Sequence, residues 1–155
     1  MNRFELKHTA IRDVHTGTGT VLMQPSNLYE CTLGENCFVG PFTEIQKGVV
    51  IGNNCRIQSH SFICEMVTIG DDCFIGHGVM FINDTFSDGA PAAGNKSKWK
   101  KTVISNRVSI GSNATILPVT ICEGVVIGAG AVVTKDIIEK GVYAGNPAKK
   151  IRSLK

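Results

Sequence analysis

Two histidines, two acidic residues and an amide fall within a short middle stretch of this 155-residue chain. They are His60, Glu65, His77, Asn83 and Asp84. A histidine that is neutral near pH 7 can take a proton from a nucleophilic amine or hydroxyl. A carboxylate can orient such a histidine or hold a substrate amine, and an amide can donate to a developing oxyanion. These residue types predict general-base transfer chemistry, provided that the fold brings them together.

The elements that must position these groups follow from a six-residue repeat. Every sixth residue is aliphatic or aromatic at Leu33, Val39, Ile45, Ile51, Ile57, Ile63, Ile69, Ile75 and Phe81. The pattern returns at Ile104, Ile110 and Ile116, slips by one residue, and continues at Ile121, Ile127 and Val133. A six-residue period fits neither an α-helix nor plain strand alternation. It is typical of the hexapeptide parallel β-helix, in which short strands are joined by tight corners.

Three hexads per turn would stack residues that are eighteen apart in the sequence. Glu65 and Asn83 then share one column, and Ser59 and His77 share another. His60 and His77 fall on the same corner of consecutive coils, which are spaced by about 5 Å. The repeat therefore predicts that the candidate catalytic residues converge within two coils, beside one long loop.

Six cysteines are present, and three of them, Cys37, Cys55 and Cys73, are eighteen residues apart. We expect a column of buried, reduced thiols that fill space, and no disulfide framework. No CxxC pair indicates a zinc site. The net charge of +3, the lack of an arginine-rich arm and the lack of a long apolar run predict a cytoplasmic protein without nucleic-acid or membrane partners.

The repeat also divides the chain, which we interpret as a single domain over residues 1–155. Residues 1–27 have a weak repeat and predict an irregular first coil or cap. Residues 82–102, rich in glycine and proline and then in lysine, predict a loop thrown out of the coil. Residues 135–155 predict a tail that leaves the coil, with a short basic helix from Pro147 to Leu154.

The last coils offer a second kind of site. The small residues Gly128, Ala129, Gly130 and Ala131 leave backbone amides open to a narrow ligand. The basic side chains that follow can meet phosphates; they are Lys135, Lys149, Lys150 and Arg152.

Two stretches carry a family resemblance. The chain closes on IGAGAVVTKDI and YAGNPAKKI, and its middle reads IQSHSFICEMVTIGDDCFIGHGVMFIND, then a loop, then TVISNRVSIGSNATILPVTI. From about residue 28 onward it resembles the hexapeptide-repeat acyltransferase superfamily, whose members are left-handed parallel β-helices. The middle looks like the branch that N-acetylates nucleotide-linked amino sugars, especially 3-amino sugars used for surface polysaccharide or lipopolysaccharide.

This resemblance implies a homotrimer with active sites in clefts between neighbouring coils. It implies acetyl-CoA as co-substrate, a nucleotide-linked amino sugar as acceptor, direct transfer without an acyl-enzyme, and no metal. The catalytic candidates are His60, His77 and Asn83, and the substrate-binding candidates are Glu65, Asn83 and Asp84. The cofactor-side candidates are Gly111, Asn113, Ala129, Lys135, Lys149 and Arg152.

The chain departs from the superfamily pattern in two places. The stretch Ile116–Ile121 is one residue short, with Cys122 in place of the usual glycine. The loop carries Thr85, Phe86 and Ser87 where this branch commonly has a Tyr-Pro-Arg element after Asn-Asp. The choice between uridine and thymidine nucleotides, and between either histidine and a base-free route, stays open.

Three rival functions remain. The first is an O-acetyltransferase on the same fold, acting on a simple sugar or serine. The second is a zinc hydrolyase of the carbonic-anhydrase branch, which requires three converging histidines. The third is a non-catalytic scaffold, which a failure to bind any acyl-CoA would favour.

Overall fold

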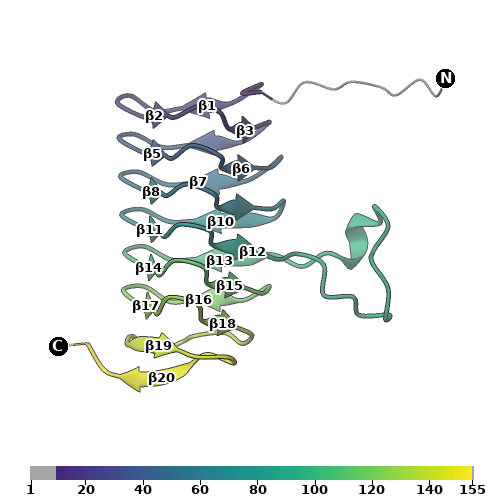
Figure 1. Ribbon diagram of the computed structural model, residues 1–155, viewed down its shortest axis with the longest axis vertical. Helices are drawn as coiled ribbons and strands as arrows, with labels where there is room; N and C mark the ends of the chain where they lie inside the picture. Colours follow the sequence, from purple (N-terminus) through teal and green to yellow (C-terminus); the bar gives the residue numbers. More distant parts are fainter. Residues whose placement is uncertain (1–9, 155) are drawn as a thin grey trace.

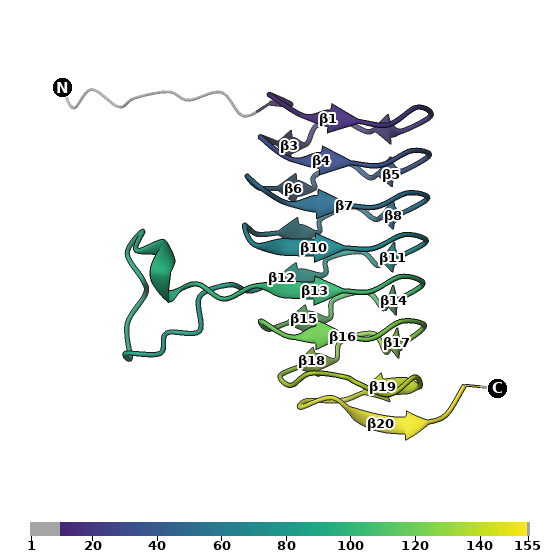
Figure 2. The same cartoon turned by 180° about the vertical axis from the view of Figure 1, so that it is seen from behind.

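The computed structural model describes residues 10–154 and is a parallel β-helix of about seven coils (Figures 1 and 2). Three parallel sheets run the length of the coil. Sheet 1 contains β1 (His15–Thr16), β4 (Thr32–Leu33), β7 (Val50–Ile51), β10 (Val67–Ile69), β13 (Thr102–Ile104) and β16 (Thr120–Ile121). Sheet 2 contains β2 (Val21–Leu22), β5 (Phe38–Val39), β8 (Arg56–Ile57), β11 (Phe74–Ile75), β14 (Ser109–Ile110), β17 (Val126–Ile127), β19 (Val142–Ala144) and β20 (Lys149–Arg152). Sheet 3 contains β3 (Asn27–Leu28), β6 (Glu44–Ile45), β9 (Phe62–Ile63), β12 (Met80–Phe81), β15 (Thr115–Ile116) and β18 (Val132–Val133).

The eighteen-residue winding is confirmed by the strand register. Val39 pairs with Ile57, which pairs with Ile75, so the repeated apolar residues stack in columns. Beyond the loop, Ile110 pairs with Ile127, seventeen residues later. The corner between β15 and β16 is one residue shorter than usual, and the coil stays in register across it.

The stacked apolar residues form one continuous core. Side chains such as Ile57, Ile75 and Ile110 are fully buried. Cys37, Cys55 and Cys73 are also buried, and the Sγ atoms of Cys37 and Cys55 donate to carbonyl oxygens of the next coil at 3.1 Å. The predicted interior thiol column is therefore confirmed, and all six cysteines are free.

Two sequence predictions about the ends of the coil are wrong. The described part of residues 1–27 is not irregular, because β1, β2 and β3 form a complete coil in register with β4, β5 and β6; residues 1–9 of that range lie outside the described part. The tail forms no helix over residues 147–154. Instead β19 extends sheet 2 and β20 pairs with it antiparallel, which covers the edge that the last coil would expose.

The predicted loop is confirmed. The chain leaves the coil after β12, carries one 3₁₀ turn, η1 (Lys96–Lys98), and returns at β13 (Figures 1 and 2). Within residues 10–154, no helix has the length and apolar character needed to cross a bilayer.

Candidate active site

The candidate residues lie along two corners that flank sheet 3. The histidine corner joins sheet 2 to sheet 3 and contains residues 40–43, 58–61, 76–79, 111–114 and 128–131 in successive coils. The loop corner joins sheet 3 to sheet 1 and contains residues 46–49, 64–66 and the loop 82–101. Sheet 3 contributes only a two-residue strand to each coil, so the two corners are close together. Side chains from both corners can therefore face one ligand.

His77 is oriented by a serine directly above it in the column. Its Nδ1 lies 2.9 Å from the Oγ of Ser59, and its imidazole is exposed. When Nδ1–H donates to Ser59, the lone pair of the ring is on Nε2, which is the form required of a general base. The predicted column of Ser59 and His77 is thus confirmed, and it gives His77 a defined orientation.

His60 has a different partner. Its ring stacks on that of Phe42 with centroids 4.9 Å apart and an interplanar angle of 27°. The two histidines share the histidine corner as predicted, but they occupy neighbouring columns, and His60 lies under Phe42 while His77 lies under Ser59. Of the two, the structure orients only His77 by a side-chain hydrogen bond.

Left-handed backbone occurs at all three corners of the coil, and at the histidine corner it falls on two bulky ring side chains. Phe42 and His60 have φ of +60° and +63°, a region that bulky side chains rarely occupy. The same place is held by Gly78, Asn113 and Gly130 in later coils, and these residue types tolerate it. The stacked rings of Phe42 and His60 therefore place an aromatic surface at this corner.

Glu65 lies at the loop corner, with its side chain 18% exposed. Its carboxylate is bound by the ammonium of Lys96 from the loop, and that ammonium also lies 5.4 Å from the centre of the Trp99 ring. The carboxylate and the indole face together form a site that holds an alkylammonium group.

A chain of hydrogen bonds runs down sheet 3 and the loop corner. Asn27 Nδ2 donates to Glu44 Oε2 at 3.1 Å, and Gln46 Nε2 donates to Glu44 Oε1 at 2.8 Å. Gln46 Oε1 accepts from the Glu65 amide at 3.3 Å, and Asn83 Nδ2 donates to the Glu65 carbonyl at 3.2 Å. Glu65 and Asn83 therefore adjoin as predicted, and this polar ladder links them to the first coils.

Asp84 supports the loop. Its Oδ1 accepts from the amide of Phe86 at 3.0 Å and its Oδ2 from the amide of Ala92 at 2.7 Å. These hydrogen bonds lower the pKa of Asp84 and keep it ionised. Both of its oxygens accept hydrogen bonds within the loop, and its contact with substrate stays a prediction.

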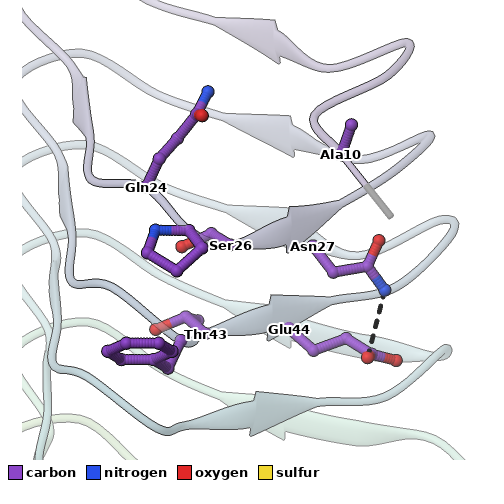
Figure 3. Close-up of a pocket in the computed structure, with 8 residues that line it drawn as sticks. Ala10, Gln24, Ser26, Asn27, Thr43 and Glu44 are labelled. Atoms are coloured by element: carbon purple, nitrogen blue, oxygen red, sulfur yellow. Dashed lines mark hydrogen bonds between the residues drawn. The ribbon is translucent and has the colours of Figure 1, made fainter. Parts of the chain in front are cut away.

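A pocket of about 350 Å³ opens at the top of this face, beside Phe42. It is lined by Ala10, Gln24, Pro25, Ser26, Asn27, Phe42, Thr43 and Glu44. Figure 3 shows the side chains of Asn27 and Glu44 extending from adjacent strands and joined by their hydrogen bond. Sequence reasoning missed this pocket because its residues lie in the first two coils, where the repeat is weakest.

The cofactor-side candidates fall into two groups. Gly111, Asn113 and Ala129 lie on the histidine corner in the two coils after His77, and the Asn113 amide donates to the His77 carbonyl at 2.7 Å. A Cβ on Gly111 would lie 2.5 Å from the Ala129 nitrogen, so only glycine allows the two coils to approach there. The basic residues Lys135, Lys149 and Arg152 are exposed on the last coil, whereas Lys150 is paired with Glu139.

Five of the six thiols are buried, including Cys73, whose pKa is lowered by its hydrogen bond with the Cys55 thiol. Burial raises the pKa of Cys31 to about 11 and that of Cys64 to about 12. Among the residues that the structure describes, no group of three or more His, Cys, Asp or Glu side chains could hold a metal ion.

Coils of hexads around an aliphatic core, with polar groups on one corner, define a hexapeptide-repeat β-helix. Two family models match: "Bacterial transferase hexapeptide (six repeats)" over residues 30–65, and "Hexapeptide repeat of succinyl-transferase" over residues 66–80 and 101–135. Together they cover more than half of the chain, which belongs to the hexapeptide-repeat acyltransferase family.

Curated relatives of the chain include the bifunctional protein GlmU of several bacteria. The chain is 29% identical to that of Nitratidesulfovibrio vulgaris over 139 residues, which is 85% of this chain and 30% of the relative. It is 33% identical to that of Carboxydothermus hydrogenoformans over 144 residues, which is 87% of this chain and 32% of the relative. The chain therefore spans about a third of the length of these relatives.

Solved structures share the fold. A variant of AntD, an N-acyltransferase from Bacillus cereus, in complex with dTDP and coenzyme A, superposes with a TM-score of 0.82 at 24% identity, covering 91% of this chain and 83% of that one. Another variant, in complex with dTDP-4-amino-4,6-dideoxyglucose and coenzyme A, gives 0.81 at 23% identity, covering 92% and 84%. A hexapeptide-repeat acetyltransferase from Vibrio cholerae, complexed with acetyl coenzyme A, gives 0.56 at 23% identity, covering 88% and 72%.

Proposed function

We propose that the protein transfers an acetyl group from acetyl-CoA to the amine of a nucleotide-linked amino sugar. The observation that carries this proposal is the column of Ser59, His77 and Ala129 on the histidine corner. It sets an oriented imidazole two coils above a small-residue surface that ends at a basic tail. The family membership and the AntD complexes with a dTDP-amino sugar and coenzyme A support the same acceptor and donor classes.

The transfer is direct. The acceptor amine attacks the thioester carbonyl, the carbon–sulfur bond breaks, and coenzyme A leaves as the thiol. His77 Nε2 takes the proton that the amine loses and returns it to the thiolate sulfur. Holding amine and thioester in reactive contact supplies most of the rate, an effect of up to roughly 7–11 kcal/mol.

Glu65, Asn83 and the cofactor-side residues also have places in this proposal. Glu65 holds the acceptor amine, and Asn83, hydrogen-bonded to the Glu65 backbone, donates its second amide hydrogen to the acceptor or to the tetrahedral oxygen. Gly111, Asn113 and Ala129 line the path of the pantetheine arm, and Lys135, Lys149 and Arg152 meet the phosphates. The proposal also holds that the protein is a cytoplasmic homotrimer and that it serves the synthesis of surface polysaccharide.

The test is release of free coenzyme A thiol with a panel of acceptors. At least one UDP- or dTDP-linked 3-amino or 4-amino sugar should give turnover, whereas serine and the nucleotide sugars that carry a hydroxyl in place of the amine should give none. Mass spectrometry of the product should show one acetyl group on nitrogen. Turnover with alcohols alone would overturn the proposal in favour of O-acetyl transfer, and absence of acyl-CoA binding would overturn acyl transfer altogether.

A further inference from the structure

The pocket beside Phe42 takes no part in the transfer chemistry described above. It lies in the first two coils, above His60, and combines one aromatic wall with one polar wall. The aromatic wall is the ring of Phe42, which is 58% exposed. The polar wall consists of Asn27 and Glu44, and Gln24 stands at the rim (Figure 3).

The aromatic wall is maintained against the local backbone preference. Phe42 occupies a left-handed corner place, with φ of +60°; the same column continues with His60 and then with glycine or asparagine. Such a conformation costs on the order of 1–3 kcal/mol and persists where the surroundings require it. The His60 ring packs against one face of Phe42, 4.9 Å away, and so fixes its plane as a platform for a flat ligand.

The polar wall has a defined donor and acceptor pattern. Arg12 Nη1 donates to Asn27 Oδ1 at 3.3 Å, so the amide is oriented with its NH₂ group toward Glu44. One hydrogen of that NH₂ is used by Glu44, which leaves the other for a ligand. The Glu44 oxygens accept from Asn27 and Gln46 and retain further lone pairs.

A donor next to a carboxylate complements the imide edge of uracil or thymine, where an N–H stands beside a C=O. The stacking platform suits the flat face of the same ring. Resting on the proposed function, we propose that the Phe42 pocket binds the uracil or thymine base of the nucleotide that carries the acceptor sugar. Glu44 accepts the base N3–H, Asn27 donates to a neighbouring carbonyl, and Phe42 stacks on the ring.

The spacing along the coil agrees with this placement. The pocket lies in the first two coils, and Glu65 and His77 follow about two coils further down. Two coils amount to about 10 Å, which leaves room for the ribose and diphosphate between base and amino sugar. The base, the amine and the thioester are then arranged in order along one face.

Isothermal titration of the whole chain with UDP, dTDP and N3-methyl-UDP tests the pocket. Either UDP or dTDP should bind, and N3-methylation should weaken UDP binding about tenfold or more, because a hydrogen bond to a charged acceptor is lost. Glu44→Gln should abolish that discrimination. Phe42→Asn, which suits the corner conformation, should weaken binding at least about fivefold. Glu35→Gln and Phe74→Ala, on other parts of the coil, should bind as wild type does.

Pyrophosphate binding as tightly as UDP, or equal affinities for UDP and N3-methyl-UDP, would overturn the base pocket. Acetyl transfer whose acceptor KM is unchanged in Glu44→Gln and Phe42→Asn would overturn the pocket and leave the proposed function standing. Selective binding of UDP or dTDP by a protein that shows no acetyl transfer would overturn the proposed function and leave the base pocket standing.

Discussion

The carboxylate of Glu65, proposed to hold the substrate amine, is occupied by the ammonium of Lys96, a residue 31 positions later in the loop. An amine that enters this site must displace Lys96, so the loop and the substrate compete for the Glu65 carboxylate. The competition is limited because Lys96 is 55% exposed and water screens the pair.

Replacing Lys96 by methionine should therefore lower the acceptor KM by about two- to fivefold and leave kcat unchanged. Initial rates over a range of acceptor concentrations measure both constants. Lys98→Met is the matched control, because Lys98 pairs with Asp88 in the same loop and not with Glu65. A rise in the acceptor KM of Lys96→Met would show instead that Lys96 contacts the substrate.

The hydrogen bond between Ser59 and His77 gives a second prediction. His77→Ala should reduce kcat by about a hundredfold or more while the dissociation constant for coenzyme A stays within about twofold. Ser59→Ala should reduce kcat by a smaller factor, because it removes only the orientation of the His77 ring. The pH dependence of kcat should also change in this variant. His60→Asn should affect kcat less than His77→Ala does. Equal and unchanged turnover in all three variants would exclude a histidine base and favour an amine that arrives already deprotonated.

These residues show which contacts could be predicted from the sequence. The period of eighteen placed Ser59 above His77 and Glu65 beside Asn83, since a buried aliphatic column leaves the coil no other register. The pairing of Glu65 with Lys96 could not be predicted from the sequence, because the loop has no repeat that fixes the position of Lys96. Pro147 and the lysines after it suggested a helix, but β20 is required there as a strand to pair with the exposed edge of β19.

The interior thiols predict a low reactivity toward Ellman's reagent. Cys122 is half-buried and the other five cysteines are buried, so the native protein should show at most one fast thiol and the unfolded protein six. Cys122→Ser should remove the fast phase. Two or more fast thiols in the native protein would contradict the packed column.

The same burial has a consequence at alkaline pH. Burial raises the pKa of Cys64 from 9.0 to about 12, so the thiol ionises in the unfolded chain before it does so in the folded one. The contribution to stability is complete below pH 9 and is lost as the pH rises towards 12. Urea unfolding across this window should show falling stability, and Cys64→Ala should show a shallower decline than wild type.

Asp84 gives the loop a pH dependence of the opposite sign. Hydrogen bonds from Ala92 and Phe86 lower its pKa below the ordinary value of 3.8, so its support of the loop is present above that value and is lost as the pH falls through the lowered pKa. Trp99, the one tryptophan of the chain, lies in this loop and reports its state by fluorescence. Its emission should shift to the red as wild type is acidified, and Asp84→Asn should show part of that shift already at pH 7, since an amide has one acceptor oxygen for two backbone donors. Asp88→Asn, which removes an exposed carboxylate from the same loop, should behave as wild type at pH 7. Identical emission in Asp84→Asn and wild type at pH 7 would mean that the ion pair of Glu65 with Lys96, and not Asp84, holds the loop in place.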